Sequence, residues 1–167
     1  MEDIESLTIG QMLARRSSAE QEASRLIGQL VFSFSRLVNN LHLCVAWHND
    51  GKDLDRYGDT AGDLAAADLI KRIERQAASR FGEDSKRHKK YKYWTARAHK
   101  IREQRNIIMH SRWSIEPYGR HATAISTPIF VEPKNELAYT LGTLADICAD
   151  CEQLTNELAQ LRTEHPL

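Results

Sequence analysis

Apolar residues recur every three or four positions over four long stretches of the chain. In the first stretch, from about residue 17 to residue 49, the apolar positions are Leu26, Ile27, Leu30, Phe34, Leu37, Val38, Leu41 and Val45. This spacing puts the apolar side chains on one face of an α-helix, and such a face packs against a core. The pattern therefore predicts one long scaffold helix. Phe32, Leu43 and Trp47 lie off its stripe and predict a second apolar surface, which is typical of a dimer face.

The two ends of this helix carry recognisable signals. Ser17-Ser-Ala-Glu20 matches a capping box, in which a hydroxyl and a carboxylate satisfy the free amides of the first turn. Residues 1–17 would then form an N-terminal arm. Asn49-Asp-Gly51 predicts a turn after the helix, and residues 50–62, rich in Asp and Gly, predict a loop.

Apolar periodicity predicts three further helices, at residues 61 or 63 to 80, 84–112 and 134–164. Phe81-Gly82 ends the first of these. The last has a near-heptad series made of Leu137, Leu141, Leu144, Cys148, Cys151, Leu154, Leu158 and Leu161. Between the last two helices, residues 113–133 are rich in proline and β-formers, which predicts an irregular insertion with a small hairpin turning at Pro117-Tyr-Gly119.

These elements predict an all-α fold, an up-and-down bundle of four main helices with a small β-hairpin or extended insertion before the last helix. The 167 residues are most simply one domain. No apolar run reaches the roughly 18 residues that a membrane-spanning helix needs. Three cysteines without a paired framework favour a reducing compartment, so we expect a cytoplasmic protein. Cys148 and Cys151 are expected to be packed thiols, and no cofactor or metal site is predicted.

The net charge is zero, but the charge is unevenly distributed along the chain. Residues 80–112 contain 11 Lys or Arg against 3 Asp or Glu, whereas residues 1–70 contain 6 against 11 and residues 113–167 contain 3 against 8. A basic segment with interleaved aromatic residues is the composition expected where phosphates bind and bases stack. The interleaved aromatic residues are Tyr91, Tyr93 and Trp94, and the candidate RNA-binding residues are Lys89, Lys90, Lys92, Arg102 and Arg112. The alternative is a solvated helix face docked on the acidic remainder of the fold.

The end of the basic segment carries the candidate chemistry, in the run Arg105-Asn106-Ile107-Ile108-Met109-His110. On a helix, Arg105 interrupts an apolar stripe, and Asn106 lies one turn from His110. With 15 Arg and 7 His in the chain, an Arg five positions before a His is expected by chance roughly 0.6 times. Requiring Asn directly after the Arg lowers that expectation to about 0.02, so the run is a usable hypothesis.

These three residue types suit RNA cleavage by the substrate's own 2′-hydroxyl. A histidine, with an ordinary pKa of about 6.5, exchanges a proton near neutral pH. An arginine stays charged and stabilises the pentacoordinate phosphate, and Asn106 would orient His110 or the substrate. The motif region has no carboxylate pair or His/Cys cluster to hold a divalent ion, which favours a metal-independent reaction.

The run resembles the motif of HEPN domains, small helical modules of toxin–antitoxin and abortive-infection systems and of RNA-processing nucleases. Their motif is Arg, four to six residues, then His, often with Asn after the Arg and toward the end of a late helix. The resemblance implies an endoribonuclease that acts as a toxin or phage-defence component. It further implies a homodimer that apposes two motifs, with Arg105, Asn106 and His110 as catalytic residues. It also implies an antitoxin or nucleotidyltransferase partner. Toxins silenced by a nucleotidyltransferase are similar to Arg-x4-His-x-Tyr, from which Ser111 and Arg112 depart.

Three alternatives use the same residues differently. Arg105 could be structural, paired with an acid such as Glu103 or one on the last helix, with His110 favoured by the helix dipole. The chain could instead be a non-catalytic RNA- or nucleotide-binding HEPN module. It could also be a protein that docks a partner through its last helix and its exposed apolar face.

Overall fold

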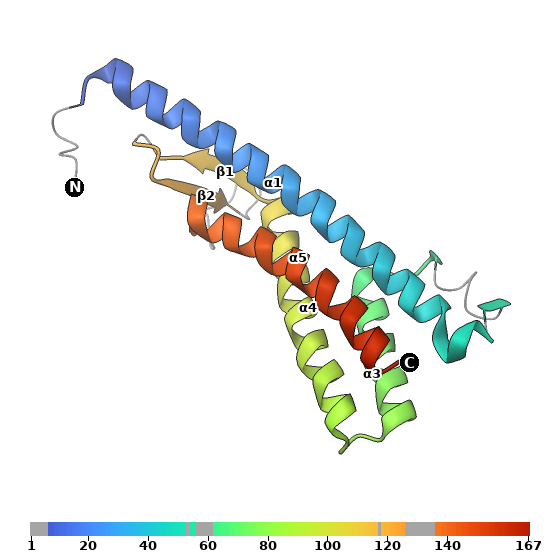
Figure 1. Cartoon of the computed structure of the whole chain (residues 1–167). Helices are drawn as coiled ribbons and strands as arrows, with labels where there is room; N and C mark the ends of the chain where they lie inside the picture. The colour runs from blue at the N-terminus through green and yellow to red at the C-terminus, as the bar shows by residue number, and fades with distance from the viewer. Residues whose placement is uncertain (1–6, 53, 56–61, 117, 126–135) are drawn as a thin grey trace. The chain divides into compact units, whose positions relative to one another are not determined.

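The computed structural model describes residues 7–52, 54–55, 62–116, 118–125 and 136–167. Its elements are α1 (Ile9–Ala46), the 3-10 helix η2 (His48–Gly51), α3 (Ala66–Phe81), α4 (Lys86–His110), β1 (Arg112–Ile115), β2 (His121–Ile125), β3 (Glu136–Thr140) and α5 (Leu141–Glu164) (Figure 1). The fold is therefore mostly helical, with a small antiparallel sheet inserted before the last helix. This confirms the predicted fold class.

Helix α1 begins eight residues, or about two turns, before the predicted start at Ser17, so the capping box predicted there was wrong. The first turn is capped instead by Thr8 and Gln11. The Thr8 hydroxyl accepts a hydrogen bond from the Gln11 amide at 3.3 Å, and the Gln11 side-chain oxygen accepts one from the Thr8 amide at 2.9 Å. This reciprocal pair is itself a capping box. Residues from Ile9 to Ser17, assigned to an arm by the sequence, are the first turns of α1.

Residues Glu136–Thr140 form strand β3, where the sequence predicted the start of the last helix. The strand pairs with β2 in an antiparallel register that sets Tyr139 opposite Ala122. Leu137, counted in the heptad series, is exposed on this strand. The helix starts only at Leu141, where the Thr140 hydroxyl accepts a hydrogen bond from the Thr143 amide at 2.9 Å.

The sheet has the order β1-β2-β3, one strand more than the predicted hairpin. Its first turn contains Gly119, as predicted, with a positive φ of 68°. A Cβ at this glycine would lie 2.8 Å from the Arg15 carbonyl oxygen, so the turn packs directly on the backbone of α1. The rest of the predicted insertion, residues 126–135, and most of the predicted loop at 50–62 lie outside the described residues.

The chain packs as two compact units, and α1, α4 and α5 contribute residues to both. The first unit comprises Met1–Val31 and Gln104–Cys148, and the second comprises Phe32–Glu103 and Ala149–Leu167. The single domain that chain length suggests stays a prediction. No described helix is both long and apolar enough to cross a membrane.

In the first unit, the beginning of α1 packs with the sheet and with the beginning of α5. Its buried residues are Ala19, Ala23, Leu26, Leu30, Ile108, Ile115, Ala122, Ala124, Tyr139, Leu144, Ile147 and Cys148. The Cys148 thiol donates a hydrogen bond to the Leu26 carbonyl, with sulfur and oxygen 3.2 Å apart. This confirms Cys148 as a packed thiol, and Cys151 of the second unit is likewise buried and free of any disulfide.

In the second unit, α3 and α4 form an antiparallel pair joined after Gly82, whose φ of 80° ends α3 where the sequence predicted (Figure 1). The core residues include Leu37, Leu41, Val45, Leu69, Ile70, Ile73, Trp94, Ala98, Leu154 and Leu158. The Trp94 indole donates a hydrogen bond to the Leu154 carbonyl at 3.0 Å, which joins α4 to α5. Phe32, Leu43 and Trp47 are 73%, 56% and 55% exposed, as their position off the core stripe predicted.

Candidate functional site

The residues of the candidate motif occupy the last turns of α4, in the first unit. Ile108 is buried on the apolar row, whereas Arg105 is half-buried and His110 is exposed. The helix therefore holds the stem of Arg105 at the margin of a core and presents the imidazole to solvent. The position of Arg105 beside the buried Ile108 agrees with the prediction that Arg105 interrupts an apolar stripe.

Arg105 and Asn106 are in direct contact. The Arg105 Nη1 donates a hydrogen bond to the Asn106 Oδ1 at 3.2 Å. Consecutive helical residues point about 100° apart, so this bond requires the guanidinium to bend toward the amide. With its oxygen engaged in this way, Asn106 keeps its NH2 group as a donor toward other groups. The contact joins two of the three motif residues.

Two side chains beyond the motif fix the end of α4, and sequence reasoning missed both. The Ser111 hydroxyl donates to the Ile107 carbonyl at 2.6 Å, and the Trp113 indole donates to the Ile108 carbonyl at 3.0 Å. These bonds satisfy carbonyls that lack helical partners at a C-terminus. The Trp113 ring also packs against Tyr139 of β3, with centroids 5.7 Å apart. The turn that carries His110 is therefore tied to the sheet. The available signal was a serine and a tryptophan directly after the helix.

The predicted helix at residues 84–112 included Arg112, and this was wrong. Arg112 is the first residue of β1, and its side chain is exposed. It remains in the same unit as Arg105 and His110. Arg102 belongs to the second unit and is half-buried, and its Nη2 contacts Glu103 at 3.1 Å. Burial, and then the charge of Arg102, lower the pKa of nearby His99.

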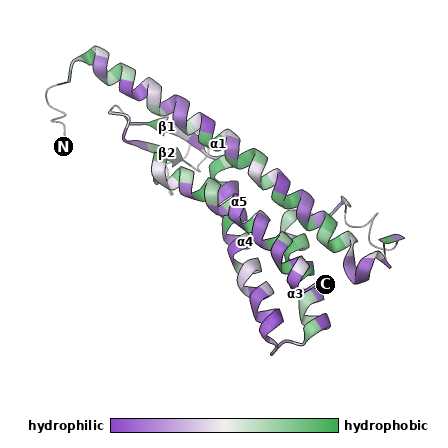
Figure 2. Cartoon of the chain, viewed as in Figure 1, coloured by the Kyte–Doolittle hydropathy of each residue, from purple (hydrophilic) through white to green (hydrophobic). Residues whose placement is uncertain are grey.

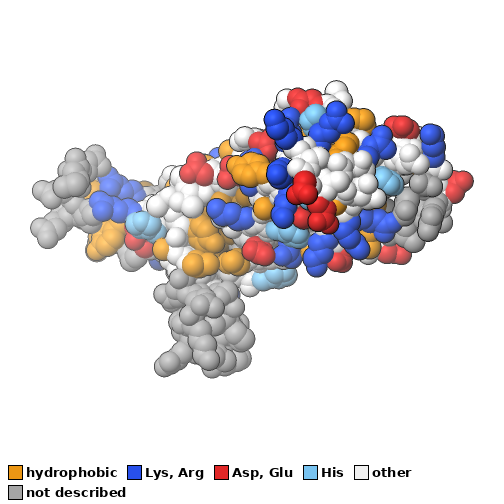
Figure 3. All heavy atoms as spheres, turned by 90° about the horizontal axis from the view of Figure 1, so that it is seen from below, with side chains coloured by type: hydrophobic (Ala, Val, Ile, Leu, Met, Phe, Trp, Pro, Cys, Tyr) orange, Lys and Arg blue, Asp and Glu red, His pale blue; other side chains and the backbone are white. Residues whose placement is uncertain are grey.

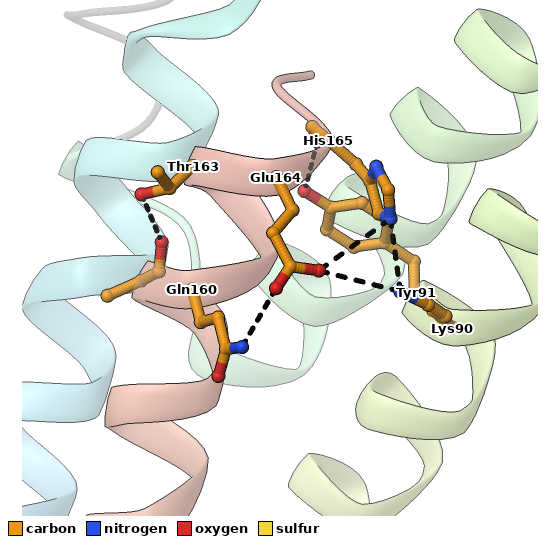
Figure 4. Close-up of polar contacts among 7 residues, drawn as sticks. Lys90, Tyr91, Gln160, Thr163, Glu164 and His165 are labelled. Carbon is orange, nitrogen blue, oxygen red and sulfur yellow. Dashed lines mark hydrogen bonds and ion pairs between the residues drawn. The ribbon is translucent and has the colours of Figure 1, made fainter.

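Lys89, Lys90 and Lys92 are exposed on α4 in the second unit, and most of this helix is hydrophilic (Figure 2). Lys90 is engaged by α5: its Nζ lies 3.4 Å from the Glu164 carboxylate and 3.2 Å from the His165 Nε2 (Figure 4). Hydrogen bonds from Gln160 and then from Lys90 lower the pKa of Glu164. For Lys90, this supports the alternative of a basic face docked on acidic residues.

Lys89 and Lys92 line a cleft of about 760 Å³ between α3 and α4. Its charged lining residues are Lys71, Glu74, Arg75, Glu83, Asp84, Lys89 and Lys92. On the face drawn in Figure 3, Lys and Arg side chains are likewise interleaved with Asp and Glu. The surface around Lys89 and Lys92 therefore carries both positive and negative charges.

Only one of the three interleaved aromatic residues is placed to stack on a base. Tyr91 and Trp94 are buried, and the Tyr91 hydroxyl donates to the His165 carbonyl at 2.8 Å (Figure 4). Burial raises the pKa of Tyr91 above its ordinary range. Tyr93 is 68% exposed. Tyr91 and Trp94 are therefore core residues that are not available for base stacking, and Trp94 lies on the apolar row with Ala98 and Ile101 that helical spacing predicts.

The structure thus gathers Arg105, Asn106, His110 and Arg112 in the first unit and places the three lysines and Arg102 in the second. Among the described residues, no three His, Cys, Asp or Glu side chains are grouped where they could hold a metal ion. Comparison of the chain with protein-family models, with curated proteins and with solved structures found no match.

Proposed function

We propose that the protein is a metal-independent endoribonuclease of the HEPN type. The observation that carries this proposal is the end of α4, where a half-buried Arg105 is bonded to Asn106 at 3.2 Å and His110 is exposed on the last turn. A fixed cation, an amide donor and an accessible imidazole are the groups that cleavage by a 2′-hydroxyl requires.

In the proposed reaction, one His110 takes the proton of the RNA 2′-hydroxyl while the 2′-oxygen bonds to the neighbouring phosphorus. The bond from phosphorus to the 5′-oxygen breaks, and a second imidazole gives that oxygen a proton. Arg105 stabilises the charge on the pentacoordinate phosphate, and the Asn106 NH2 group orients substrate or imidazole. The products are a 2′,3′-cyclic phosphate and a 5′-hydroxyl.

One chain supplies one His110, so the proposal includes a two-fold homodimer that brings two motifs together. An exposed apolar stripe, which runs from Phe32 of α1 to Trp47 directly after that helix, supports the dimer. At about 100° per residue, Phe32, Leu43 and Trp47 fall within about 60° around the helix. Each is more than half exposed. The HEPN resemblance adds a cytoplasmic role as a toxin or phage-defence component, with an antitoxin or nucleotidyltransferase as a further partner.

The second candidate function is a non-catalytic RNA- or nucleotide-binding module. Exposed Lys89 and Lys92 and the exposed ring of Tyr93 favour it, because lysines can bind phosphates and a tyrosine can stack on a base without any contribution from His110. In a third function, the same exposed apolar stripe docks a different protein.

A cleavage assay separates these functions. Wild type is compared with His110→Ala, Arg105→Ala and the control His121→Ala, which removes another exposed histidine of the first unit. We expect His110→Ala to abolish cleavage and His121→Ala to preserve it. Arg105→Ala should lose roughly 3 kcal/mol of transition-state stabilisation, or a hundredfold or more in rate.

Folding and binding measurements complete this test. A structural Arg105 would show itself as a lowered melting temperature in Arg105→Ala, whereas a catalytic one leaves the fold intact. Salt-titrated RNA binding without cleavage would favour the binding module, and absence of both would favour the docking protein.

A further inference from the structure

Tyr93 is the exposed aromatic residue of the basic helix. The Arg97 guanidinium, one turn later, lies over its ring, 5.6 Å from the ring centroid. A ring that is 68% exposed and has one such neighbour still presents aromatic surface to solvent. Such a surface offers a partner the stacking contact that nucleobases make with tyrosine.

Arg97 is also held by an ion pair with α5. Its Nη1 donates to the Glu157 carboxylate of α5 at 2.6 Å, and Gln153 donates to the other Glu157 oxygen at 2.7 Å. The hydrogen bond to Glu157 raises the pKa of Arg97. Because the ion pair with α5 already fixes the Arg97 side chain, Arg97 lies over the Tyr93 ring before any ligand binds. Less side-chain entropy is then lost when a ligand binds beside this ring.

A cleft of about 280 Å³ opens beside the ring, and its lining includes Tyr93, Trp94, Arg97, Glu157, Gln160 and Leu161. Lys90 and Glu164 complete the charged lining, which gives two cations and two carboxylates. This balance gives little net attraction for a phosphate. It suits an uncharged planar ligand with polar edges, because the carboxylates accept from amino groups and the cations donate to carbonyls.

Exposed lysines follow the same face of α4. At about 100° per residue, Lys86, Lys89 and Lys100 lie within about 40° of Tyr93 around the helix. All three are exposed, and all belong to the second unit with Tyr93. A polyanion bound along this face would therefore contact lysines on both sides of the Tyr93 ring. The cleft itself would hold an uncharged part of the ligand.

We propose that Tyr93 and this cleft bind one unpaired base of single-stranded RNA, with the base stacked on the ring and the neighbouring phosphates on Lys86, Lys89 and Lys100. The inference rests on the proposed function only in taking RNA as the ligand. It requires neither His110 nor cleavage.

The test uses the full chain and a fluorescent, 2′-O-methylated single-stranded oligonucleotide, which has no free 2′-hydroxyl and so cannot be cleaved by the proposed route. Anisotropy should show that Tyr93→Ala weakens binding about 5- to 150-fold, the range for loss of one base–aromatic stack. Tyr93→Phe keeps the ring and should bind like wild type. Tyr118→Ala is the matched control, because it removes an exposed tyrosine of the first unit.

Two further readouts separate stacking from charge. The salt slope should be the same in Tyr93→Ala as in wild type, since tyrosine displaces no counterions. An oligonucleotide whose bases are replaced by abasic sites should bind wild type and Tyr93→Ala equally. A general loss of folded protein would instead weaken both probes.

The outcomes are distinguishable from those of the nuclease assay. Equal binding of the base-bearing probe by wild type and Tyr93→Ala overturns the base site and leaves the nuclease proposal untouched. No binding of this probe by wild type overturns the base site as well. Tyr93-dependent binding by a protein that cleaves nothing upholds the base site and overturns the nuclease.

Discussion

Replacing Gly119 with alanine should destabilise the fold more than any other single methyl addition to a described glycine of the first unit. The φ of 68° costs a residue with a Cβ roughly 1–2 kcal/mol. The new Cβ would lie 2.8 Å from the Arg15 carbonyl oxygen and 3.0 Å from the carbonyl carbon. Both atoms are backbone and cannot rotate away, so overpacking adds roughly 1–3 kcal/mol. The expected loss is about 2–5 kcal/mol.

Urea unfolding measures this free energy, and Gly28→Ala is the matched control. Gly28 lies inside α1 in the same unit, and nothing stands within 4 Å of its added Cβ. The same methyl group should there stabilise the protein by about 0.5–1 kcal/mol, because alanine favours a helix. The two variants should therefore differ in sign. If Gly119→Ala matched or exceeded wild type in stability, the turn would not pack against α1 at Arg15.

Three further predictions follow from charge, burial and exposure. Lys89→Gln combined with Lys92→Gln should reduce the slope of log binding constant against log salt for a single-stranded RNA by about 0.7 units for each of the two lysines that contacts a phosphate, and Lys90→Gln by less because Glu164 already engages it; an unchanged slope would mark a solvated face. Burial lowers the pKa of His99 below 6.5, so its contribution to stability is present above pH 6.5 and lost as the pH falls through the folded-state pKa. Unfolding of His99→Gln should thus vary less than wild type between about pH 7 and pH 5, and parallel curves would contradict this. Sedimentation at about 50 µM should show a dimer that Leu43→Lys with Trp47→Lys dissociates and Ile9→Ser does not; a monomeric wild type would argue against a composite site.

Local periodicity predicted the helices because residues spaced three or four apart lie on one face of a helix, and that face packs in the core. Val45 and Leu154, both on predicted apolar rows, are fully buried. Strand β3 escaped because its pairing with β2 is a nonlocal contact, and a leucine repeat cannot distinguish a helix from the strand before it. The start of α1 escaped because Gly10, a weak helix former, obscured the capping box formed by Thr8 and Gln11.

In the candidate site, too, features that depend on local sequence were easier to predict than those that depend on distant contacts. The helical pattern predicted that Asn106 lies one turn from His110, with a role in orienting His110 or the substrate, whereas the hydrogen bond that the structure gives Asn106 is with its neighbour Arg105. The exposure of Tyr91 and Tyr93 could not be predicted from composition, because composition does not show which side of the helix a tyrosine lies on. Helical spacing placed Trp94 on one apolar row with Ala98 and Ile101, and all three are buried. The support that Trp113 and Tyr139 give to the end of α4 depends on the sheet, which local pattern did not reveal.

The central claim concerns how RNA is cut, and the chemical ends of the product test it most directly. A 5′-labelled RNA is incubated with wild-type protein in excess EDTA, with the same sequence in DNA as a control. We predict cleavage of RNA alone, leaving a 2′,3′-cyclic phosphate and a 5′-hydroxyl, because the proposed nucleophile is the 2′-hydroxyl and the proton carrier is His110. Loss of cleavage in EDTA, cleavage of DNA, or products with 3′-hydroxyl ends would contradict the account.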